Sequence, residues 1–253
     1  MKELAEAAEI VARGQYVVAL TGAGISVDSG IPDFRSPGGL WDRFDPMEYA
    51  HIEAFYANPR KVWNMLREMS GTVRNAKPNS GHLALAELER LGLLKAIITQ
   101  NIDNMHQDAG STNVIEFHGN VRQLVCMRCN ARYNAREVET LTEKEGVFPP
   151  VCPHDGQILK PNVVFFGEAI PIEASYQSQY QAEACDVMLV IGTSATVFPA
   201  SGIPMIARRT GATVIEFNIT STPLTGAVAQ LSILGSSSVT LPEMVKLIAE
   251  TSG

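Results

Sequence analysis

The feature that most constrains the fold is an apolar run that passes directly into a glycine-rich turn. Residues 16–20 read YVVAL, which is typical of a fully buried strand, and three small residues soon follow: Gly22, Ala23 and Gly24. Glycines two positions apart let the backbone bend tightly and let a ligand approach without a Cβ in the way. The turn favours a phosphate-binding cradle, with the Ser26 hydroxyl beside it. The alternative is a plain connection, because Val27 stands where a dinucleotide fingerprint has its third glycine.

Apolar runs and helical patterns alternate along the rest of the chain. Strands are predicted at 95–99, 114–117, 162–166, 187–191, 213–217 and 233–234. Helices are predicted at 2–13, 82–91 with Ser80 as N-cap, 171–184, 199–210 and 241–251. Residues 42–80 read as helical and irregular, and residues 121–159 as polar and irregular. The alternation predicts an α/β fold with a mostly parallel, doubly wound sheet covered on both faces.

Unusual polar residues follow the predicted strands. Ligands of parallel sheets bind beyond the carboxyl ends of the strands. Those ends carry the segments 22–26, 100–103, 167–168 and 192–194, together with His118 and Asn218. The segments are far apart in the sequence, but this topology brings them to one edge of the sheet. Their convergence predicts a site large enough for a dinucleotide.

Three side chains at this edge are candidates for chemistry. Imidazole titrates near neutral pH, so His118 is a candidate general base, although many histidines serve only structure. Asn101 and Asp103 lie two positions apart, where an amide can hold a water or hydroxyl and a carboxylate can accept a hydrogen bond from a carboxamide. The alternative role of this pair is to cap the following helix.

The cysteines indicate a metal site. The chain has four, of which Cys126, Cys129 and Cys152 form a CxxC…C pattern that favours metal or redox chemistry over a disulfide in a cytosolic chain. The spacing puts Asp155 in the place of a fourth zinc ligand, with His154 beside it. We expect a structural zinc site that either residue completes.

The net charge and the apolar content of the chain limit the kinds of partner that it can bind. The formal net charge of −7 argues against nucleic acid and membrane surfaces and suits a cationic ligand, such as a lysine-rich segment. No apolar run is long enough to span a bilayer, and the first residues, MKELAEAAEIVARG, do not resemble a secretory signal. We expect a cytoplasmic monomer that binds neither nucleic acid nor membrane.

Taken in order, the motifs resemble those of the sirtuin family of NAD-dependent protein deacylases. GAGIS, SGIPDFRS, TQNID, the strand-end HG, CxxC…C, NVVFFGE, GTS and Asn218 occur in that family's order and cover nearly the whole chain. The resemblance implies a Rossmann-like NAD-binding domain made of residues 1–33, 81–121 and 160–253. It also implies a smaller lobe made of a helical module, 34–80, and a zinc-binding module, 122–159. NAD and an acyl-lysine peptide would enter the cleft between them from opposite sides.

The same resemblance implies roles for individual residues. NAD would be bound by Gly22, Ala23, Gly24, Ser26, Phe34, Arg35, Gln100, Asn101, Asp103, His118, Gly192, Thr193, Ser194, Asn218 and Ser237. Val164 and Phe166 would border the acyl-lysine peptide, and Cys126, Cys129, Cys152 and Asp155 would hold zinc. The catalytic residues would be His118, Asn101 and Asp103. After nicotinamide leaves, His118 would act as base on a ribose hydroxyl, and lysine and O-acyl-ADP-ribose would be released.

Two departures from the family pattern bear on these expectations. The fourth zinc cysteine is missing, which affects metal occupancy. Sirtuins that prefer negatively charged acyl groups carry a tyrosine and an arginine three apart, and the aligned positions here are Leu66 and Met69. We therefore expect an uncharged acyl group such as acetyl. Three other functions compete: an NAD-dependent dehydrogenase, a mono-ADP-ribosyltransferase on the same scaffold, and a non-catalytic zinc-ribbon interaction module.

Overall fold

The larger sheet reverses its strand order next to its first strand. The computed structural model describes residues 2–251, so the outermost domain ends predicted above, 1 and 252–253, lie outside the described residues. The parallel strands β1 (Val17–Thr21), β2 (Leu94–Thr99), β3 (Val114–Glu116), β7 (Val187–Ile191), β8 (Thr213–Asn218) and β9 (Leu231–Leu234) lie in the order β3-β2-β1-β7-β8-β9. The order reverses between β1 and β7, which is where such sheets bind ligands.

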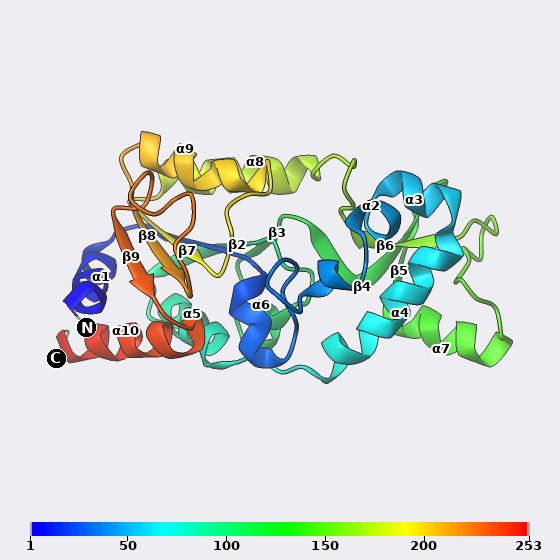
Figure 1. The fold of residues 1–253 in the computed structure, drawn as a ribbon, viewed down its shortest axis with the longest axis horizontal. Coiled ribbons are helices and arrows are strands. Elements are labelled where there is room, and N and C mark those ends of the chain that lie inside the picture. Colours follow the sequence, from blue (N-terminus) through cyan, green and yellow to red (C-terminus); the bar gives the residue numbers. More distant parts are fainter. Residues whose placement is uncertain (1, 252–253) are drawn as a thin grey trace.

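Helices cover both faces of this sheet (Figure 1). One face packs against α1 (Lys2–Arg13), α5 (Ser80–Arg90) and α10 (Ser237–Thr251), and the other against α8 (Ile172–Ala184) and α9 (Ile203–Arg209). In β1, Val17 and Ala19 belong to the first core cluster, whereas Val18 and Leu20 belong to the second. Burial on both faces explains why this strand is apolar throughout. The prediction of a doubly wound α/β sheet is confirmed.

The remaining elements form a smaller part at one end of the molecule (Figure 1). Its antiparallel sheet has the order β5-β4-β6, from β4 (Gly119–Cys126), β5 (Arg132–Asn134) and β6 (Leu159–Val163). Its helices are α2 (Pro46–Tyr49), α3 (Ile52–Ala57), α4 (Pro59–Asn75) and α7 (Ala135–Glu145). Val62 and Trp63 of α4 share a core cluster with Leu124 and Leu159 of the small sheet. The two sequence insertions therefore pack against each other.

The remaining elements are short helices: the 3₁₀ helices η1 (Ala23–Ser29), η2 (Leu40–Asp42) and η3 (Ala200–Gly202), and the α-helix α6 (Met105–Asp108). Within residues 2–251, none of the helices combines the length and the apolar character needed to cross a bilayer.

Several local predictions were wrong. The strand predicted at 162–166 is β6, which ends at Val163 and pairs antiparallel with β4 instead of joining the parallel sheet. The N-cap of α5 is Asn79 and not Ser80, because the Asn79 side chain accepts the Gly81 amide while His82 Nδ1 accepts the Asn79 amide. The helices predicted to start at 199 and 241 start at 203 and 237, and the segment predicted to be irregular, 121–159, contains β5 and α7.

Candidate active site

The turn after β1 touches the turn after β7. Gly24 N donates to the Gly192 carbonyl oxygen at 2.8 Å. A Cβ on Gly192 would lie 2.4 Å from Ile25 N, and a Cβ on Gly24 would lie 2.8 Å from Gly192 Cα. Gly192 also has a φ of 58°, which other residues rarely adopt. Glycine at both positions is therefore what allows the two loops to meet at the switch point of the sheet.

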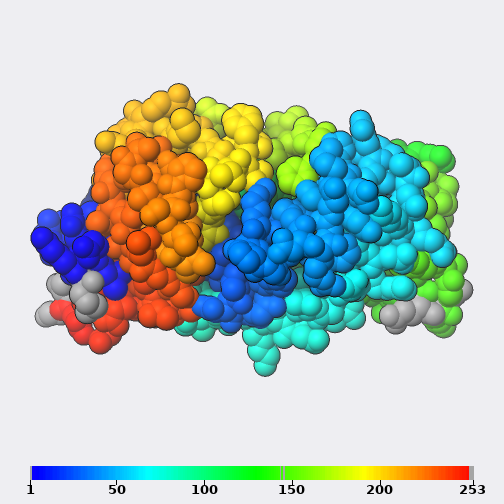
Figure 2. Space-filling model, viewed as in Figure 1, coloured from blue at the N-terminus to red at the C-terminus, as the bar shows by residue number. Residues whose placement is uncertain are grey.

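A single cavity of about 1440 Å³ extends from this contact along the carboxyl edge of the sheet. It is lined by every residue predicted to bind cofactor or peptide: Gly22, Ala23, Gly24, Ser26, Phe34, Arg35, Gln100, Asn101, Asp103, His118, Val164, Phe166, Gly192, Thr193, Ser194, Asn218 and Ser237. In Figure 2 the blue segment that follows β1 lies between the orange and yellow C-terminal elements and the cyan helices. Typical small-molecule pockets measure roughly 300–1,000 Å³, so this cavity has room for a dinucleotide and a second ligand.

Three buried polar side chains form a network at the turn. Asp103 Oδ2 accepts a hydrogen bond from Ser26 Oγ at 2.7 Å. Asn101 Nδ2 donates to the Gly22 carbonyl oxygen at 3.1 Å and to Ser26 Oγ at 3.2 Å. Asp103 Oδ1 also accepts the amide of Met105, the first residue of α6, so Asp103 braces the helix start as well as lining the cavity. Burial raises the pKa of the Asp103 carboxyl.

His118 follows β3 and has one ring nitrogen free for chemistry. Its Nδ1 lies 3.0 Å from the Gln100 carbonyl oxygen. A carbonyl can only accept, so Nδ1 carries the proton and Nε2 keeps its lone pair, with no hydrogen-bond partner among the described residues. Burial lowers the pKa of His118, and the bond to Gln100 opposes this shift. The ring is therefore neutral at pH 7 and able to act as a base.

Side chains tie the ends of β2, β7 and β8 together. Gln100 Nε2 donates to Thr193 Oγ1 at 3.1 Å, and Asn218 Nδ2 donates to the Thr193 carbonyl oxygen at 2.9 Å. Ser194 is exposed beside them, and Ser237 is buried at the first turn of α10. This part of the cavity offers hydroxyl and amide groups from three strand ends and one helix.

The loop that carries Phe34 and Arg35 is closed by its own hydrogen bonds. Trp41 N donates to the Phe34 carbonyl oxygen at 3.0 Å, and Asp33 Oδ1 accepts the amide of Arg35 at 2.9 Å. The rings of Phe34 and Trp41 have centroids 5.1 Å apart, and Trp41 lies 6.3 Å from the ring of Phe166. A row of three rings therefore connects this loop to the segment predicted to border the peptide.

The segment 164–166 forms backbone hydrogen bonds with two different parts of the molecule. Val164 N donates to the His118 carbonyl oxygen at 2.9 Å. Phe166 N donates to the Ala50 carbonyl oxygen at 2.8 Å, and Ile52 N donates to the Phe166 carbonyl oxygen at 3.0 Å. Residues 164–166 thus join the candidate base to the helical insertion.

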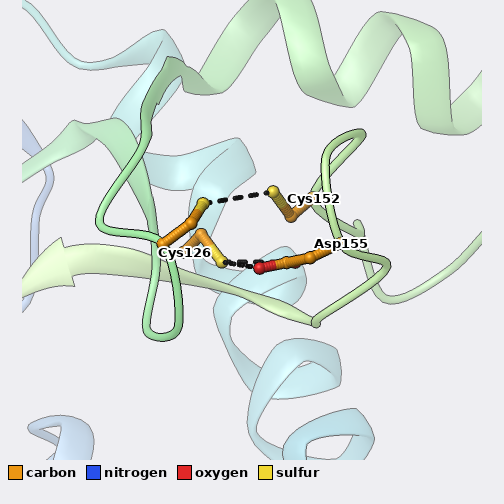
Figure 3. Close-up of side chains that lie close together, drawn as sticks. Cys126, Cys152 and Asp155 are labelled. Atoms are coloured by element: carbon orange, nitrogen blue, oxygen red, sulfur yellow. Dashed lines mark hydrogen bonds between the residues drawn. The ribbon is translucent and has the colours of Figure 1, made fainter.

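Three cysteines and Asp155 form a compact cluster in the small sheet region. Figure 3 shows Cys126 facing Cys152 and Asp155 across two loops, and the four ligand atoms, including Cys129 Sγ, lie within 4.8 Å of one another. Cys129 Sγ is 3.7 Å from Cys152 Sγ, and Cys126 Sγ is 3.4 and 3.5 Å from the Asp155 oxygens. Tetrahedral zinc with ordinary bond lengths needs about 3.8 Å between two sulfurs and about 3.5 Å between sulfur and oxygen. The donor set therefore fits zinc.

The structure places Asp155, and not His154, beside the three cysteines. Asp155 Oδ1 accepts the Gln157 amide at 3.0 Å, which orients the carboxylate in the cluster. His154 is exposed and does not belong to the cluster; its ring lies 6.4 Å from that of Tyr133. The Tyr133 hydroxyl lies 3.1 Å from Cys152 Sγ, as a supporting contact.

Sequence reasoning missed three groups beside the site. His82 has Nε2 3.4 Å from Ser26 Oγ; its position three residues after Asn79 was the available signal. Trp41 follows the SGIPDFRS motif by five residues, but only the fold shows its contact with Phe166. Lys160 pairs with Glu168 at 3.0 Å, and nothing local distinguishes this buried lysine from an exposed one.

Sequence comparison identifies relatives along almost the whole chain. A model of the Sir2 family matches residues 22–199. An NAD-dependent protein deacylase from Pyrococcus abyssi is 41% identical over 242 residues, which cover 96% of each chain. An NAD-dependent protein deacetylase from Caldivirga maquilingensis is 47% identical over 217 residues, which cover 86% of this chain and 83% of that one.

Solved structures agree. A Sir2 homologue in complex with NAD superposes with a TM-score of 0.89 at 41% identity, covering 98% of this chain and 94% of that one. A Sir2 structure with a deacetylated p53 peptide and 3′-O-acetyl ADP ribose gives a TM-score of 0.87 at 36% identity, covering 97% of each. The resemblance seen in the motifs is confirmed, and the chain belongs to the Sir2 family.

Proposed function

We propose that this protein is an NAD-dependent protein lysine deacylase. It would convert NAD, an acyl-lysine peptide and water into nicotinamide, O-acyl-ADP-ribose and free lysine. The observation that carries the proposal is the neutral His118 ring, which lines the large cavity with Nε2 free. Further support comes from relatives named for this activity and from the Sir2 structure that holds a deacetylated peptide with acetyl ADP ribose.

His118 would act as the general base. Bound NAD supplies a ribose whose nicotinamide is a leaving group. The Gln100 carbonyl holds the His118 ring in the tautomer that leaves Nε2 able to take a proton from a hydroxyl. Asn101 and Asp103 would lie beside the ribose and nicotinamide, and their hydrogen bonds to Ser26 would also hold the phosphate-binding turn in place.

The remaining cofactor contacts would divide between two ends of the cavity. The phosphates would lie against the turn formed by Gly22, Ala23, Gly24 and Ser26, which lines the cavity at the switch point of the sheet. The adenosine half would lie against Gly192, Thr193, Ser194, Asn218 and Ser237, which offer hydroxyl and amide groups. Phe34 and Arg35 would cover the cofactor from their loop, with Gln100 linking the two ends through Thr193.

The acyl-lysine peptide would bind beside Val164 and Phe166, and we expect its acyl group to be uncharged. Leu66 and Met69 line the same cavity and offer no charge or hydroxyl to a carboxylate. Comparison of acetylated with succinylated peptide at equal concentration tests this point. A clear preference for the succinyl form would contradict it.

We also propose the domain division given above, except that its boundaries at 121 and 160 cut through β4 and β6, which belong with the smaller lobe, and we propose zinc as a structural ion of that lobe. The shared core of α4 and the small sheet supports a lobe built from both insertions. Cys126, Cys129, Cys152 and Asp155 would hold the ion, which would tie two loops together and do no chemistry. We also propose that the protein is a cytoplasmic monomer; its negative net charge supports binding to a cationic peptide and not to nucleic acid.

Product analysis tests the function directly. Wild type, His118→Ala and the control His154→Gln are incubated with NAD and an acetyl-lysine peptide, and products are identified by mass spectrometry. We expect nicotinamide, O-acetyl-ADP-ribose and deacetylated peptide from wild type and control, and almost none from His118→Ala. Formation of NADH would indicate a dehydrogenase instead, and ADP-ribosylated protein without the acetylated nucleotide would indicate an ADP-ribosyltransferase. Lack of any NAD binding by calorimetry would favour a non-catalytic module.

A further inference from the structure

A buried ion pair is formed by two residues that flank the segment with Val164 and Phe166 in the sequence. The Lys160 and Glu168 side chains are 4% and 18% exposed, and Lys160 Nζ lies 3.0 Å from a Glu168 carboxylate oxygen. The same ammonium donates to the carbonyl oxygens of Pro161 at 3.1 Å and of Val163 at 2.6 Å. All three N–H groups of Lys160 are therefore used by partners around one turn of the backbone.

Glu168 fixes the other side of this turn. Its Oε2 accepts the Phe165 amide at 2.8 Å, and its own amide donates to the Phe165 carbonyl oxygen at 3.0 Å. Val164 N donates to the His118 carbonyl oxygen, and the Val164 carbonyl oxygen accepts no hydrogen bond from another of the described residues. That oxygen remains available to an N–H of an extended peptide, as in strand addition.

A buried ion pair is an inefficient way to gain stability. Desolvation of two charges offsets most of their attraction, and apolar residues of similar size often stabilise a protein equally well. The two charged side chains instead fix the orientation of the backbone, because they form hydrogen bonds with backbone atoms of Pro161, Val163 and Phe165. We infer that Lys160 and Glu168 are positioning residues for the acyl-lysine peptide, acting through the backbone between them. The inference rests on the proposed function, since it takes this segment as the peptide wall.

The test removes both charges together. Lys160→Met with Glu168→Met leaves no unpaired buried charge, but the Pro161 and Val163 carbonyls and the Phe165 amide lose their side-chain partners, so the double variant is expected to fold with a lower melting temperature than wild type. Binding of a fluorescein-labelled acetyl-lysine peptide is measured by anisotropy, and KM and kcat are measured for peptide and for NAD. The matched control removes the exposed ion pair of α5, by Arg90→Met with Glu87→Met.

We expect the peptide Kd and KM to rise about tenfold in the double variant, since small displacements at a binding wall have effects of this order or larger, while the KM for NAD stays unchanged. The control should match wild type. A peptide Kd within twofold of wild type would overturn the inference. If the double variant does not fold, Lys160→Met with Glu168→Gln, which also removes both charges but keeps an acceptor for the Phe165 amide, decides the question by the same Kd criterion.

The two proposals fail separately. Wild type that binds the peptide but releases no nicotinamide would refute the deacylase function, while the Kd comparison would still decide the role of the ion pair. Wild type that does not bind acetyl-lysine peptide at all would refute both.

Discussion

Acidification should destabilise the fold through two buried histidines. His106 is 1% exposed, with Nε2 2.9 Å from Thr21 Oγ1 and with Nδ1 unpartnered among the described atoms. His82 is fully buried, and the two rings have centroids 5.0 Å apart. Burial lowers the pKa of His82 to about 4 and that of His106 to about 3. Neither site can hold a proton near pH 6, whereas both side chains can once the chain unfolds.

The sign and size of the effect follow from proton linkage. The unfolded chain binds both protons below the ordinary histidine pKa of about 6.5, and the native protein does not until pH 4 or below. Stability is therefore complete above about pH 6.5 and decreases as the pH falls towards the native-state values. Each histidine removes up to about 1.4 kcal/mol per pH unit once the pH is below its unfolded pKa, so the pair removes about 3 kcal/mol between pH 6.5 and 5. That loss is a large part of a typical folding free energy of about 5–15 kcal/mol.

Urea unfolding at pH 7.5, 6.5, 5.5 and 5.0, with zinc in every buffer, measures this loss. The His82→Gln/His106→Gln variant should lose about 3 kcal/mol less than wild type between pH 6.5 and 5, by the linkage above. The control His154→Gln, at an exposed histidine, should behave as wild type. Differences between variants cancel other acid effects, such as zinc loss and the opposite contribution of Asp103, whose pKa is raised by burial. Equal losses in wild type and the double variant would refute the reasoning.

Three further predictions concern the base, the metal and the glycine contact. Because burial lowers the pKa of His118 below 6.5, kcat/KM for deacetylation should be constant from pH 7 to 8 and fall only with a midpoint below 6.5; a midpoint above 6.5 would contradict His118 as the base. Asp155→Cys should release zinc to a chelator more slowly than wild type, and Asp155→Ala faster, as read with a metal-sensitive dye; no change in either would remove Asp155 from the site. In Gly192→Ala the new Cβ would lie 2.4 Å from Ile25 N, so the Kd for NAD, measured by calorimetry, should rise at least about tenfold. In the control Gly71→Ala the new Cβ has no neighbouring atom within 4 Å, so this variant should bind NAD as wild type does.

The parallel sheet could be read from the sequence because its strands are buried on both faces. The run 187–191 was placed without error, since every residue of β7 is buried and the run is uniformly apolar. The strand ends then located the candidate site, because the topology brings Gly22, Gln100, His118 and Asn218 to one edge without any need for side-chain detail.

The small sheet could not be read in the same way. Lys160 and Pro161 interrupt the apolar run of β6, so the pattern pointed to 162–166, three residues too late. Lys160 is buried only because Glu168 and two carbonyl groups surround it, and those partners are set by the tertiary fold. The choice between Asp155 and His154 likewise depended on the turn after Cys152, which spacing alone does not define.

The row of Phe34, Trp41 and Phe166 has a consequence for ligand binding. With the proposed roles, Phe34 belongs to the cofactor side and Phe166 to the peptide side, so Trp41 forms part of a partition that both ligands share. A ligand that displaces the ring on its own side changes the surface offered to the other ligand. Thermodynamic reciprocity then requires each to alter the other's affinity by the same factor, so cooperativity between cofactor and peptide would be a property of this row of three tilted rings.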